Sequence, residues 1–492
     1  MSSQSLEKAR AYEAQAEGRI PPQQRPLLHA CPRTGWMNDP NGLSWYQGAY
    51  HLFYQYHPYD TSWGPMHWGH LVSEDLLRWR FLPAAMAPDQ PYDREGCFSG
   101  SALESPDGRH LLLYTGCTRD PATGEPRQVQ CLAVGDGVNY EKIPQNPVMT
   151  DALLPEGASK VDFRDPKLWW DAAEGRYYCV AGSRPADGSG SVLLFASPDA
   201  VHWEFVSVLD QCRNEYGKMW ECPDFFQLDG RAVLLVSPQD MRARGLEFHN
   251  GNGTLCLIGD YDPAAHAFTR RSAQAIDYGL DFYAPQTLLT PDGRRVMIGW
   301  MQSWETSRIQ PENTNWFGMM TLPRQLRVED GRLCQLPVEE ISRYYRDEVR
   351  HTGLVADRQL SLPGLEGRLA DITLTVTPGS EELYRSFTLH LAHSSEYDTR
   401  LRYWPASGIL EFDRTDSGFP HDIPMVRRVD TGCPGGRLEL RVVLDRYSVE
   451  VFVNGGRQAI TSVIHTPQQA AGILLEAEGT VEIDLEKHAL SL

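Results

Sequence analysis

Three acidic residues each stand one or two positions before a proline. They are Asp39 in WMNDPNG (36–42), Asp165 in FRDP (163–166) and Glu221 in WECPD (220–224). Proline fixes φ, so the backbone of such a segment holds its acid in a defined direction. Taken singly, each segment also fits an ordinary turn or strand end. Taken together, three held carboxylates suit the cleavage of glycosidic bonds, which uses a pair of them.

The neighbours of the three acids suggest different tasks. Asp39 stands in a rigid turn beside Asn38, and amide and backbone N–H donors favour the ionised form of a nucleophile. Glu221 has apolar neighbours, and partial desolvation suits a carboxyl that donates a proton. Asp165 follows Arg164, and we expect the guanidinium to keep it ionised, so that it grips sugar hydroxyls. A retaining glycosidase needs its nucleophile and its acid/base about 5 Å apart.

Aromatic residues that can stack on a sugar ring accompany these acids. The run 61–70 (TSWGPMHWGH) is rich in them, and within it Trp63 precedes a Gly-Pro turn. Tyr283 and Trp304 are further candidates for sugar stacking. Three other tryptophans stand in strand-like runs and are expected in the core: Trp68, Trp169 and Trp170.

A repeat explains how residues so far apart in the chain could meet. Anchors of polar or small residues, each followed by a hairpin and a further strand pair, recur about every sixty residues between 36 and 340. The anchors are Asn38-Asp39, Phe98 to Ser101, Arg164 to Pro166, Trp220 to Pro223 and Ala284 to Thr287. Five units of about four strands predict an all-β fold that begins with a five-bladed β-propeller. A large sandwich is the alternative, but it would not explain the period. In a propeller the innermost strands share one axis, so Asp39, Asp165 and Glu221 would face one funnel.

The sequence on either side of this repeat predicts three further segments. Residues 1–28 form an N-terminal helical extension, 29–340 hold the propeller, and 341–349 form a linker. Residues 350–492 alternate apolar and polar positions with period two and contain the turn Asn454-Gly455, which predicts a C-terminal antiparallel β-sandwich. We expect the sandwich to stabilise or accompany the catalytic part and not to carry catalysis.

Composition limits the partners and the compartment. Among 492 residues, 65 acidic side chains outnumber 46 basic ones, and the net charge of −19 argues against nucleic acid or anionic membranes as partners. The N-terminal segment lacks the apolar core of a signal peptide and no transmembrane run is present, so we expect a soluble, cytoplasmic protein. The ten cysteines are scattered without a Cys-x-x-Cys pair, which favours reduced thiols. His67 and His70 have no third ligand nearby, so we expect no metal there.

The motifs together resemble those of glycoside hydrolase family 32, which contains invertases, fructanases and sucrose-6-phosphate hydrolases. The likeness rests on WMNDPNG (36–42), FSGSA (98–102), FRDP (163–166), WECPD (220–224) and FYAPQT (282–287), and extends to DRYSVEVFVNGG (445–456). It implies a five-bladed propeller followed by a β-sandwich, with Asp39 as nucleophile, Glu221 as acid/base and Asp165 as stabiliser of the transition state. Further positions match residues that line the fructosyl pocket of the family: Asn38, Gln55, Trp63, Phe98, Ser99, Arg164, Tyr283 and Trp304.

The resemblance implies a retaining mechanism without metal or organic cofactor. Asp39 would attack the anomeric C2 of a β-fructofuranosyl unit while Glu221 protonates the leaving oxygen, and water activated by Glu221 would then release fructose. The stretches 51–70 and 87–102 are most similar to those of bacterial sucrose-6-phosphate hydrolases and invertases. One departure is NTNWFGMM (313–320), where the family pattern leads us to expect smaller residues.

The expected substrate is sucrose or sucrose 6-phosphate. A short-fructan hydrolase or a fructosyltransferase is the alternative within the family. A non-catalytic sugar-binding propeller is the alternative outside it, and it would require the loss of a carboxylate. A phosphate group would need basic side chains or backbone N–H groups near the glucosyl end of the substrate. Four basic residues are candidates for this contact: Arg119, Arg127, Lys160 and Lys218. The sequence leaves the oligomeric state open.

Overall fold

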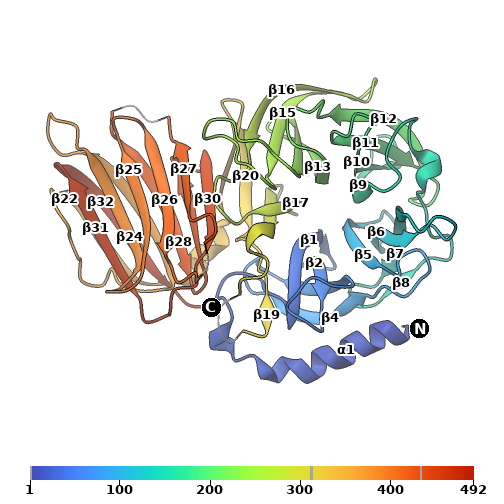
Figure 1. The fold of residues 1–492 in the computed structure, drawn as a ribbon, viewed down its shortest axis with the longest axis horizontal. Helices are drawn as coiled ribbons and strands as arrows, with labels where there is room; N and C mark the ends of the chain where they lie inside the picture. Colours follow the sequence, from blue (N-terminus) through green and yellow to red (C-terminus); the bar gives the residue numbers. More distant parts are fainter. Residues whose placement is uncertain (1–2, 311–313, 421, 433–434) are drawn as a thin grey trace.

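The computed structural model describes residues 3–310, 314–420, 422–432 and 435–492. This part of the chain consists mostly of β-strands, which confirms the prediction of an all-β fold. Its strands form seven sheets, five small ones followed by two larger ones. Figure 1 shows the small sheets and the larger sheets side by side, with the N-terminal helix running along the small ones. Asn313, where the departure from the family pattern begins, lies outside the described residues.

In the described part of the chain, each small sheet holds four antiparallel strands from one stretch of sequence, and the first sheet has a fifth, parallel strand formed by residues 316–317. The strands of the first three sheets are β1 (Gly35–Tyr46), β2 (Ala49–His57), β3 (His67–Ser73), β4 (Arg80–Met86); β5 (Gly96–Glu104), β6 (His110–Arg119), β7 (Pro126–Gly135), β8 (Tyr140–Lys142); and β9 (Phe163–Asp171), β10 (Arg176–Ser183), β11 (Ser191–Ser197), β12 (Glu204–Gln211). Those of the last two are β13 (Trp220–Leu228), β14 (Arg231–Pro238), β15 (Leu255–Asp262), β16 (Ala267–Ala275); and β17 (Tyr283–Leu289), β18 (Arg295–Trp300), β20 (Arg324–Glu329), β21 (Arg332–Pro337).

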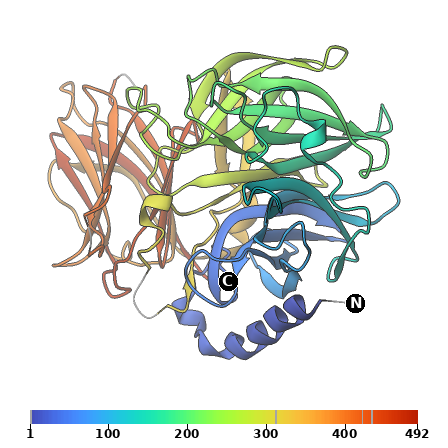
Figure 2. The same cartoon turned by 45° about the vertical axis from the view of Figure 1, so that its right-hand side comes forward.

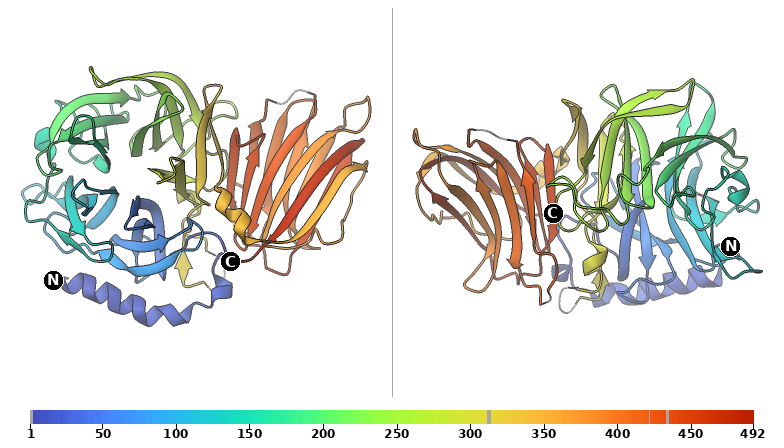
Figure 3. Two further views of the ribbon diagram at one scale, coloured as in Figure 1. Left: turned by 180° about the vertical axis from the view of Figure 1, so that it is seen from behind. Right: turned by 45° about the horizontal axis from the view of Figure 1, so that its top comes forward.

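The first strands of the small sheets lie next to one another around a common centre (Figure 3). β1 contacts β5, β5 contacts β9, β9 contacts β13, β13 contacts β17, and β17 contacts β1 again. Apolar side chains fill the space between neighbouring sheets, as Leu113, Phe163 and Phe195 do between the second and third. This ring is consistent with the predicted propeller, and it brings the start of five distant segments to one place.

Strand β19 (Trp316–Phe317) joins the end of the ring to its beginning. It pairs in parallel with β1, where Phe317 stacks on Trp36 with ring centroids 4.7 Å apart. Gly318 has φ of 85°, and a Cβ at this position would meet the carbonyl oxygen of Met37 at 2.0 Å, so only glycine fits. The large residues that depart from the family pattern in 314–320 therefore pack as core beside β1.

The anchors of the sequence repeat all lie in the first strands, at irregularities of strand pairing. The register with the second strand shifts between Met37 and Pro40, Phe98 and Gly100, Glu221 and Asp224, and Tyr283 and Gln286, and opposite β9 between Val180 and Gly182. The residue before the proline has a positive φ in three anchors: Asp165 (64°), Cys222 (48°) and Ala284 (49°). A bulge re-aims a side chain, and such φ values in residues other than glycine concentrate at functional sites.

The last part of the chain is a pair of stacked sheets, as Figure 2 shows. One sheet holds β22 (Tyr345–Ala356), β32 (Val481–Leu490), β23 (Ala370–Pro378), β28 (Leu438–Asp445), β29 (Ser448–Val453) and β30 (Gln458–Val463). The other holds β27 (Val426–Asp430), β26 (Ile409–Asp416), β25 (Asp398–Trp404), β24 (Ser386–His393) and β31 (Gly472–Glu478). Leu389, Phe412 and Val442 belong to the apolar core between them. β22 begins at Tyr345, within the residues expected as a linker.

The helical segments are short except for the first. α1 (Gln4–Ala16) packs on the first small sheet, where Arg10 Nε donates to Ala84 O (2.9 Å) and Ala84 N donates to Glu13 Oε2 (3.0 Å). The 3₁₀ segments are η1 (Glu17–Arg19), η2 (Pro22–Gln24), η3 (Asp151–Leu153), η4 (Trp304–Thr306) and η5 (Glu339–Tyr344). In the described residues, helices are too short or too polar to cross a membrane.

A buried charge network connects the N-terminal arm, the fifth small sheet and the larger sheets. His29 Nδ1 lies 2.7 Å from Asp445 Oδ2, and His29 Nε2 lies 2.8 Å from Glu450 Oε1. Arg324 donates to Glu450 Oε2 (2.9 Å) and to Asp277 Oδ2 (2.9 Å). Burial alone would lower the pKa of His29, but hydrogen bonds and charges from Asp445 and Glu450 raise it to about 9. His29 is therefore an imidazolium at neutral pH.

This network makes stability depend on pH. A histidine whose pKa rises from 6.5 to about 9 on folding stabilises fully below pH 6.5, and the contribution of about 3 kcal/mol is lost as pH rises through 9. We expect the urea midpoint to fall over this range, and to fall less in His29→Gln. His202→Gln, at an exposed histidine, should follow the unmodified protein. Equal slopes for His29→Gln and the unmodified protein would contradict the assignment.

Candidate active site

The ring of first strands brings the three predicted carboxylates into one cluster. Cys222 connects two of them: its backbone N–H donates to Asp165 Oδ2 (2.9 Å), and its sulfur lies 3.6 Å from that oxygen and 3.7 Å from Asp39 Oδ2. Glu221 directly precedes Cys222 on β13, and the charges of Glu221 and Asp39 both act on Asp165. Strands β1, β9 and β13 thus supply one acidic cluster from three distant parts of the sequence.

Asp39 is held by two side-chain donors. Ser99 Oγ donates to Asp39 Oδ2 (2.8 Å) and Asn38 Nδ2 donates to Asp39 Oδ1 (3.0 Å). Trp36 Nε1 donates to Asn38 Oδ1 (2.7 Å), which fixes which way the Asn38 amide faces. Burial and then the charge of Glu221 nevertheless raise the pKa of Asp39, against the lowering by Ser99 and Asn38. The donors that we expected to keep Asp39 ionised are present, and burial and the neighbouring acid act against them.

Glu221 has a hydrogen-bond donor on each carboxylate oxygen. Arg164 Nε and Nη2 donate to Oε1 at 3.1 and 3.0 Å, and the Tyr283 hydroxyl donates to Oε2 at 2.6 Å. The apolar residue before it, Trp220, is fully buried in the core. The Glu221 side chain is 18% exposed, which agrees with the expected partial desolvation, but its two oxygens face a cation and a phenol and not apolar side chains.

The pKa of Asp165 is also raised. Burial raises its pKa first, Arg164 lowers it, and the charges of Glu221 and Asp39 raise it again, to about 7 in total. Arg164 Nε lies 3.9 Å from Asp165 Oδ2, farther than from Glu221. The expectation that Arg164 keeps Asp165 ionised is wrong, because the guanidinium is directed at Glu221 and burial dominates.

The raised pKa of Asp165 predicts a stabilising substitution. The unfolded side chain ionises near its ordinary pKa of 3.8 and the folded one near 7, so the free energy of unfolding falls as pH rises from about 4 to 7. Asp165→Asn keeps an acceptor for the Cys222 N–H and removes this charge. We expect it to raise the melting temperature at pH 8 by a few degrees and to leave it unchanged near pH 4. A variant that melts below the unmodified protein at pH 8 would refute the raised pKa.

Aromatic residues predicted from the sequence flank the carboxylates. The Trp63 side chain is 49% exposed and meets Phe98 edge to face with centroids 6.0 Å apart. Trp304 stacks on Trp36, with centroids 6.1 Å apart and an angle of 29°. An exposed tryptophan beside a polar site offers a flat apolar face to a sugar ring.

Gln55 and Cys222 contribute in ways that the sequence did not indicate. Gln55, which was predicted to line the pocket, is buried like Asn38 and Ser99, and its amide donates to Cys97 O (3.0 Å), so it also supports the strand that carries Phe98 and Ser99. Burial, followed by the charges of Asp165 and Asp39, raises the pKa of the Cys222 thiol well above its usual value, so a neutral thiol separates two acids. In the sequence, the only indication of this role was that Cys222 lies inside one of the repeated anchors.

Other residues singled out from the sequence contact partners other than the three carboxylates. His70 Nε2 lies 2.9 Å from His51 Nδ1, and His67 Nδ1 donates to Pro65 O (2.9 Å). The two histidines at which we expected no metal therefore bond different residues. Trp68 is fully buried. Trp169 and Trp170 are only partly buried; Trp169 stacks on Tyr178, and Trp170 meets Tyr177 edge to face. In the described chain the cysteines are free and buried.

The four basic candidates for a phosphate contact are already paired or bonded. Arg119 lies 3.6 Å from Glu95, and Lys160 lies 3.1 Å from Asp151, which also pairs with Arg127. Lys218 Nζ donates to Asn214 Oδ1 (3.4 Å). These contacts give none of the four an evident role beside Glu221.

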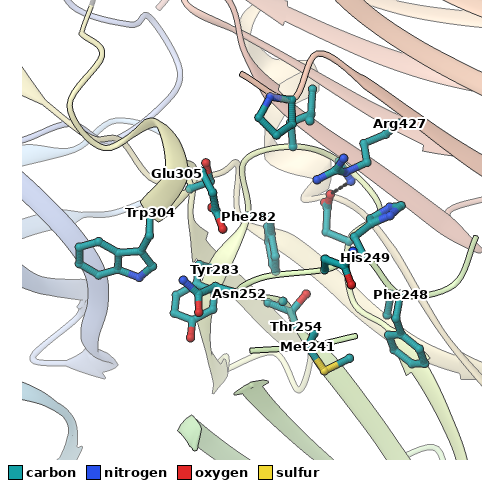
Figure 4. Close-up of a pocket in the computed structure, with 18 of the residues that line it drawn as sticks. Met241, Phe248, His249, Asn252, Thr254, Phe282, Tyr283, Trp304, Glu305 and Arg427 are labelled. Atoms are coloured by element: carbon teal, nitrogen blue, oxygen red, sulfur yellow. Dashed lines mark hydrogen bonds between the residues drawn. The ribbon is translucent and has the colours of Figure 1, made fainter. Parts of the chain in front are cut away.

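A cleft lies between Tyr283, beside the carboxylate cluster, and the larger sheets (Figure 4). Tyr283 and Trp304 line one end of it and Arg427, on β27, lines the other. Glu305 and His249 also line it. The cleft therefore begins at a residue that bonds Glu221 and ends on the C-terminal part of the chain.

An acid held by donors, a second acid with a cation and a phenol on its two oxygens, and stacking aromatics at a ring of sheets together define a glycoside hydrolase. The family model described as the glycosyl hydrolases family 32 N-terminal domain matches residues 29–337, and the family 32 C-terminal model matches residues 340–490. The chain belongs to glycoside hydrolase family 32.

Named relatives and solved structures agree with this membership. The chain is 37% identical over 475 residues to the raffinose invertase of Escherichia coli, covering 92% of each. It is 35% identical over 481 residues to the sucrose-6-phosphate hydrolase of Zymomonas mobilis, covering 93% of this chain and 90% of that one. A β-fructofuranosidase of Bombyx mori has a TM-score of 0.84 at 33% identity, covering 100% of this chain and 99% of that one. A variant of the silkworm enzyme has been solved in complex with sucrose, at a TM-score of 0.84 and 34% identity over 99% of this chain and 98% of that one.

Proposed function

We propose that the protein is a retaining β-fructofuranosidase that hydrolyses sucrose or sucrose 6-phosphate. The observation that carries this proposal is the cluster in which Cys222 separates Asp39 from Asp165, while Arg164 and Tyr283 hold the adjacent Glu221. The names of the relatives, raffinose invertase and sucrose-6-phosphate hydrolase, support the substrate class.

The roles follow from the chemistry that each position allows. Asp39 attacks C2 of the fructosyl unit as the bond from C2 to the glucosyl oxygen breaks, and Glu221 gives that oxygen its proton. In the second step Glu221 takes a proton from a water molecule that attacks C2, and the bond to Asp39 breaks. Asp165 binds fructosyl hydroxyls beside the reacting carbon. Two inversions at C2 give retention, and we expect the Asp39 and Glu221 carboxylates about 5 to 5.5 Å apart.

We propose the remaining pocket roles for residues around these acids. Asn38, Ser99 and Arg164 orient the carboxylates through the hydrogen bonds described, and Tyr283 shares Glu221 with Arg164. Side chains that contact the sugar itself through stacking or hydrogen bonding are Gln55, Trp63, Phe98 and Trp304.

We propose that the five small sheets are the blades of a five-bladed propeller, because their first strands contact one another in cyclic order. Residues 29–340 form the catalytic domain, after an N-terminal extension in residues 1–28. Residues 341–349 form the linker and 350–492 the sandwich domain, although its first strand reaches back to Tyr345.

Fructose release tests this function directly. Purified protein should release fructose from sucrose, from sucrose 6-phosphate or from both, and the ratio of the two kcat/KM values identifies the preferred substrate. In methanol the transfer product should be the methyl β-fructofuranoside, as retention requires. Release from neither substrate would refute the proposal, and an α-configured product would refute retention.

The cleft of Figure 4 favours substrates longer than a disaccharide as a second candidate. A third sugar unit attached to the glucosyl end of sucrose, as in raffinose, could follow the cleft toward Arg427. If it does, Arg427→Ala should lower kcat/KM for raffinose about tenfold, the value of one charge-assisted hydrogen bond, and leave that for sucrose within about twofold. Equal effects on both substrates would refute this path. Chain-lengthened products at high sucrose would instead indicate fructosyl transfer.

A further inference from the structure

A cluster of potential metal ligands lies on the sandwich, on strands that carry none of the carboxylates of the active site. His390 and His393 stand in β24 and Asp398 begins β25. His390 Nδ1 lies 2.9 Å from Asp398 Oδ2, and His393 Nδ1 lies 3.3 Å from Asp398 Oδ1. One ligand atom from each of the three residues lies within 4.8 Å of the others.

An irregular backbone brings the two histidines to the same carboxylate. Residues three positions apart in a regular strand point to opposite faces of the sheet. Between His390 and His393 the pairing with β31 shifts, since His390 is opposite Leu474 and His393 is opposite Gly472. Ala392, in the shift, has φ of 48°, a conformation that is unfavourable for a residue with a Cβ. The bulge re-aims one imidazole so that both reach Asp398.

Two imidazole nitrogens and a carboxylate oxygen suit a divalent ion that is intermediate between hard and soft, such as zinc. Zinc binds imidazole nitrogen and carboxylate oxygen at about 2.0 to 2.2 Å, so two ligands on a tetrahedral ion lie about 3.4 Å apart. The 3.3 Å between His393 Nδ1 and Asp398 Oδ1 matches this edge. His390 Nε2 lies 3.1 Å from Glu476 Oε2, so the ring nitrogen that faces away from Asp398 has a carboxylate partner. Such a partner fixes the tautomer of a ligating histidine and strengthens it as a ligand.

Charges around the cluster permit a cation. Arg400 Nε lies 3.8 Å from Asp398 Oδ2, but Arg400 Nη2 is bonded to Asp413 Oδ2 (2.7 Å) and Asp416 Oδ2 (3.2 Å), so three acids share its charge. The His393 side chain is 32% exposed, which leaves the cluster open to solvent. A water molecule can therefore complete a four-coordinate ion.

We propose that His390, His393 and Asp398 bind a divalent transition-metal ion of the zinc type. Glu476 accepts a hydrogen bond from the other ring nitrogen of His390 and so orients this ligand. The ion links β24 to β25 across their connection, and so stabilises the sandwich without entering the glycosidic reaction. The competing arrangement is a proton in place of the metal, with His390 as an imidazolium between Asp398 and Glu476.

Zinc binding to the chelator-treated full chain separates metal from proton. We expect one equivalent of Zn²⁺ by calorimetry at pH 7.5, visible absorption bands of tetrahedral type with Co²⁺, and a higher melting temperature with Zn²⁺. Glu476→Gln should weaken zinc binding about 10- to 100-fold. His393→Gln and Asp398→Asn should weaken it further and abolish the Co²⁺ bands.

The matched control is His202→Gln. His202 Nδ1 also lies 2.8 Å from an aspartate, Asp199, but it lies in the exposed turn between β11 and β12. This variant should bind zinc as the unmodified protein does. Retained sucrose hydrolysis and an unchanged circular dichroism spectrum will show that His393→Gln is folded. The proposal is overturned if the unmodified chain takes up no zinc, or if His393→Gln and Asp398→Asn bind it equally well.

Discussion

Asp39→Asn is expected to lower kcat for sucrose by about 10⁴-fold or more, equivalent to about 5 kcal/mol of transition-state stabilisation. An amide oxygen is a poor nucleophile, and Asn38 Nδ2, which now donates to Asp39 Oδ1, would face either an amide N–H or a weaker acceptor. The substrate should still bind, because the hydroxyl contacts and the stacking aromatics are unchanged. Rapid-quench measurement of fructose release, with KM determined separately, checks both parts.

Ser99→Ala is the matched control for this substitution. Ser99 Oγ donates one hydrogen bond to Asp39 Oδ2 at 2.8 Å and leaves the nucleophile in place. Its loss should reduce kcat by about tenfold, the value of one hydrogen bond to a charged group. If Asp39→Asn keeps more activity than Ser99→Ala, Asp39 is not the nucleophile.

Glu221→Gln is expected to lower kcat for sucrose by about 10²- to 10⁴-fold, the usual contribution of general acid/base catalysis. The loss should depend on the leaving group. An aryl β-fructofuranoside with an acidic phenol needs no proton to depart, so its first step should be little affected. The resulting fructosyl-enzyme should accumulate, because water then lacks its base, and azide, which needs no deprotonation, should restore turnover.

Tyr283→Phe serves as the control for Glu221. It removes the 2.6 Å hydrogen bond to Glu221 Oε2 and leaves the carboxyl able to transfer a proton. Its effect on sucrose and on the aryl substrate should differ little, and azide should not help. If Glu221→Gln slows the first step, measured as kcat/KM or as the burst of phenol release, equally for sucrose and for the aryl substrate, Glu221 is not the acid.

The period of the anchors was sufficient to predict that Asp39, Asp165 and Glu221 meet. It did not predict what each acid touches. Counted from the following proline, Glu221 stands at the same position as Arg164 and Tyr283, and Asp165 stands one residue later. Side chains at equal positions of neighbouring sheets are the ones that touch, since Arg164 and Tyr283 both bond Glu221. Aligning the repeats by their prolines would have indicated these partners.

Ionisation was the part that local sequence could not supply. Arg164 is next to Asp165 in the chain, but a strand turns successive side chains apart, and the guanidinium reaches Glu221. Burial of Asp39 and Asp165 depends on five sheets closing around them, which no short motif encodes. The sandwich was predicted from its period-two pattern, whereas the convergence of His390 and His393 depends on a bulge that the pattern conceals.

The parallel pairing of β19 with β1 has a consequence for biosynthesis. Strand β1, which carries Asp39, emerges from the ribosome early, but its edge opposite β2 stays without a partner until residues 316 and 317 have been made. At about 5 to 20 residues per second, that interval lasts on the order of tens of seconds. During this time an unpaired strand edge next to Trp36 is open to pairing with other chains, which is a known route to aggregation. The nascent chain therefore has its greatest need of a chaperone before its catalytic strand is enclosed.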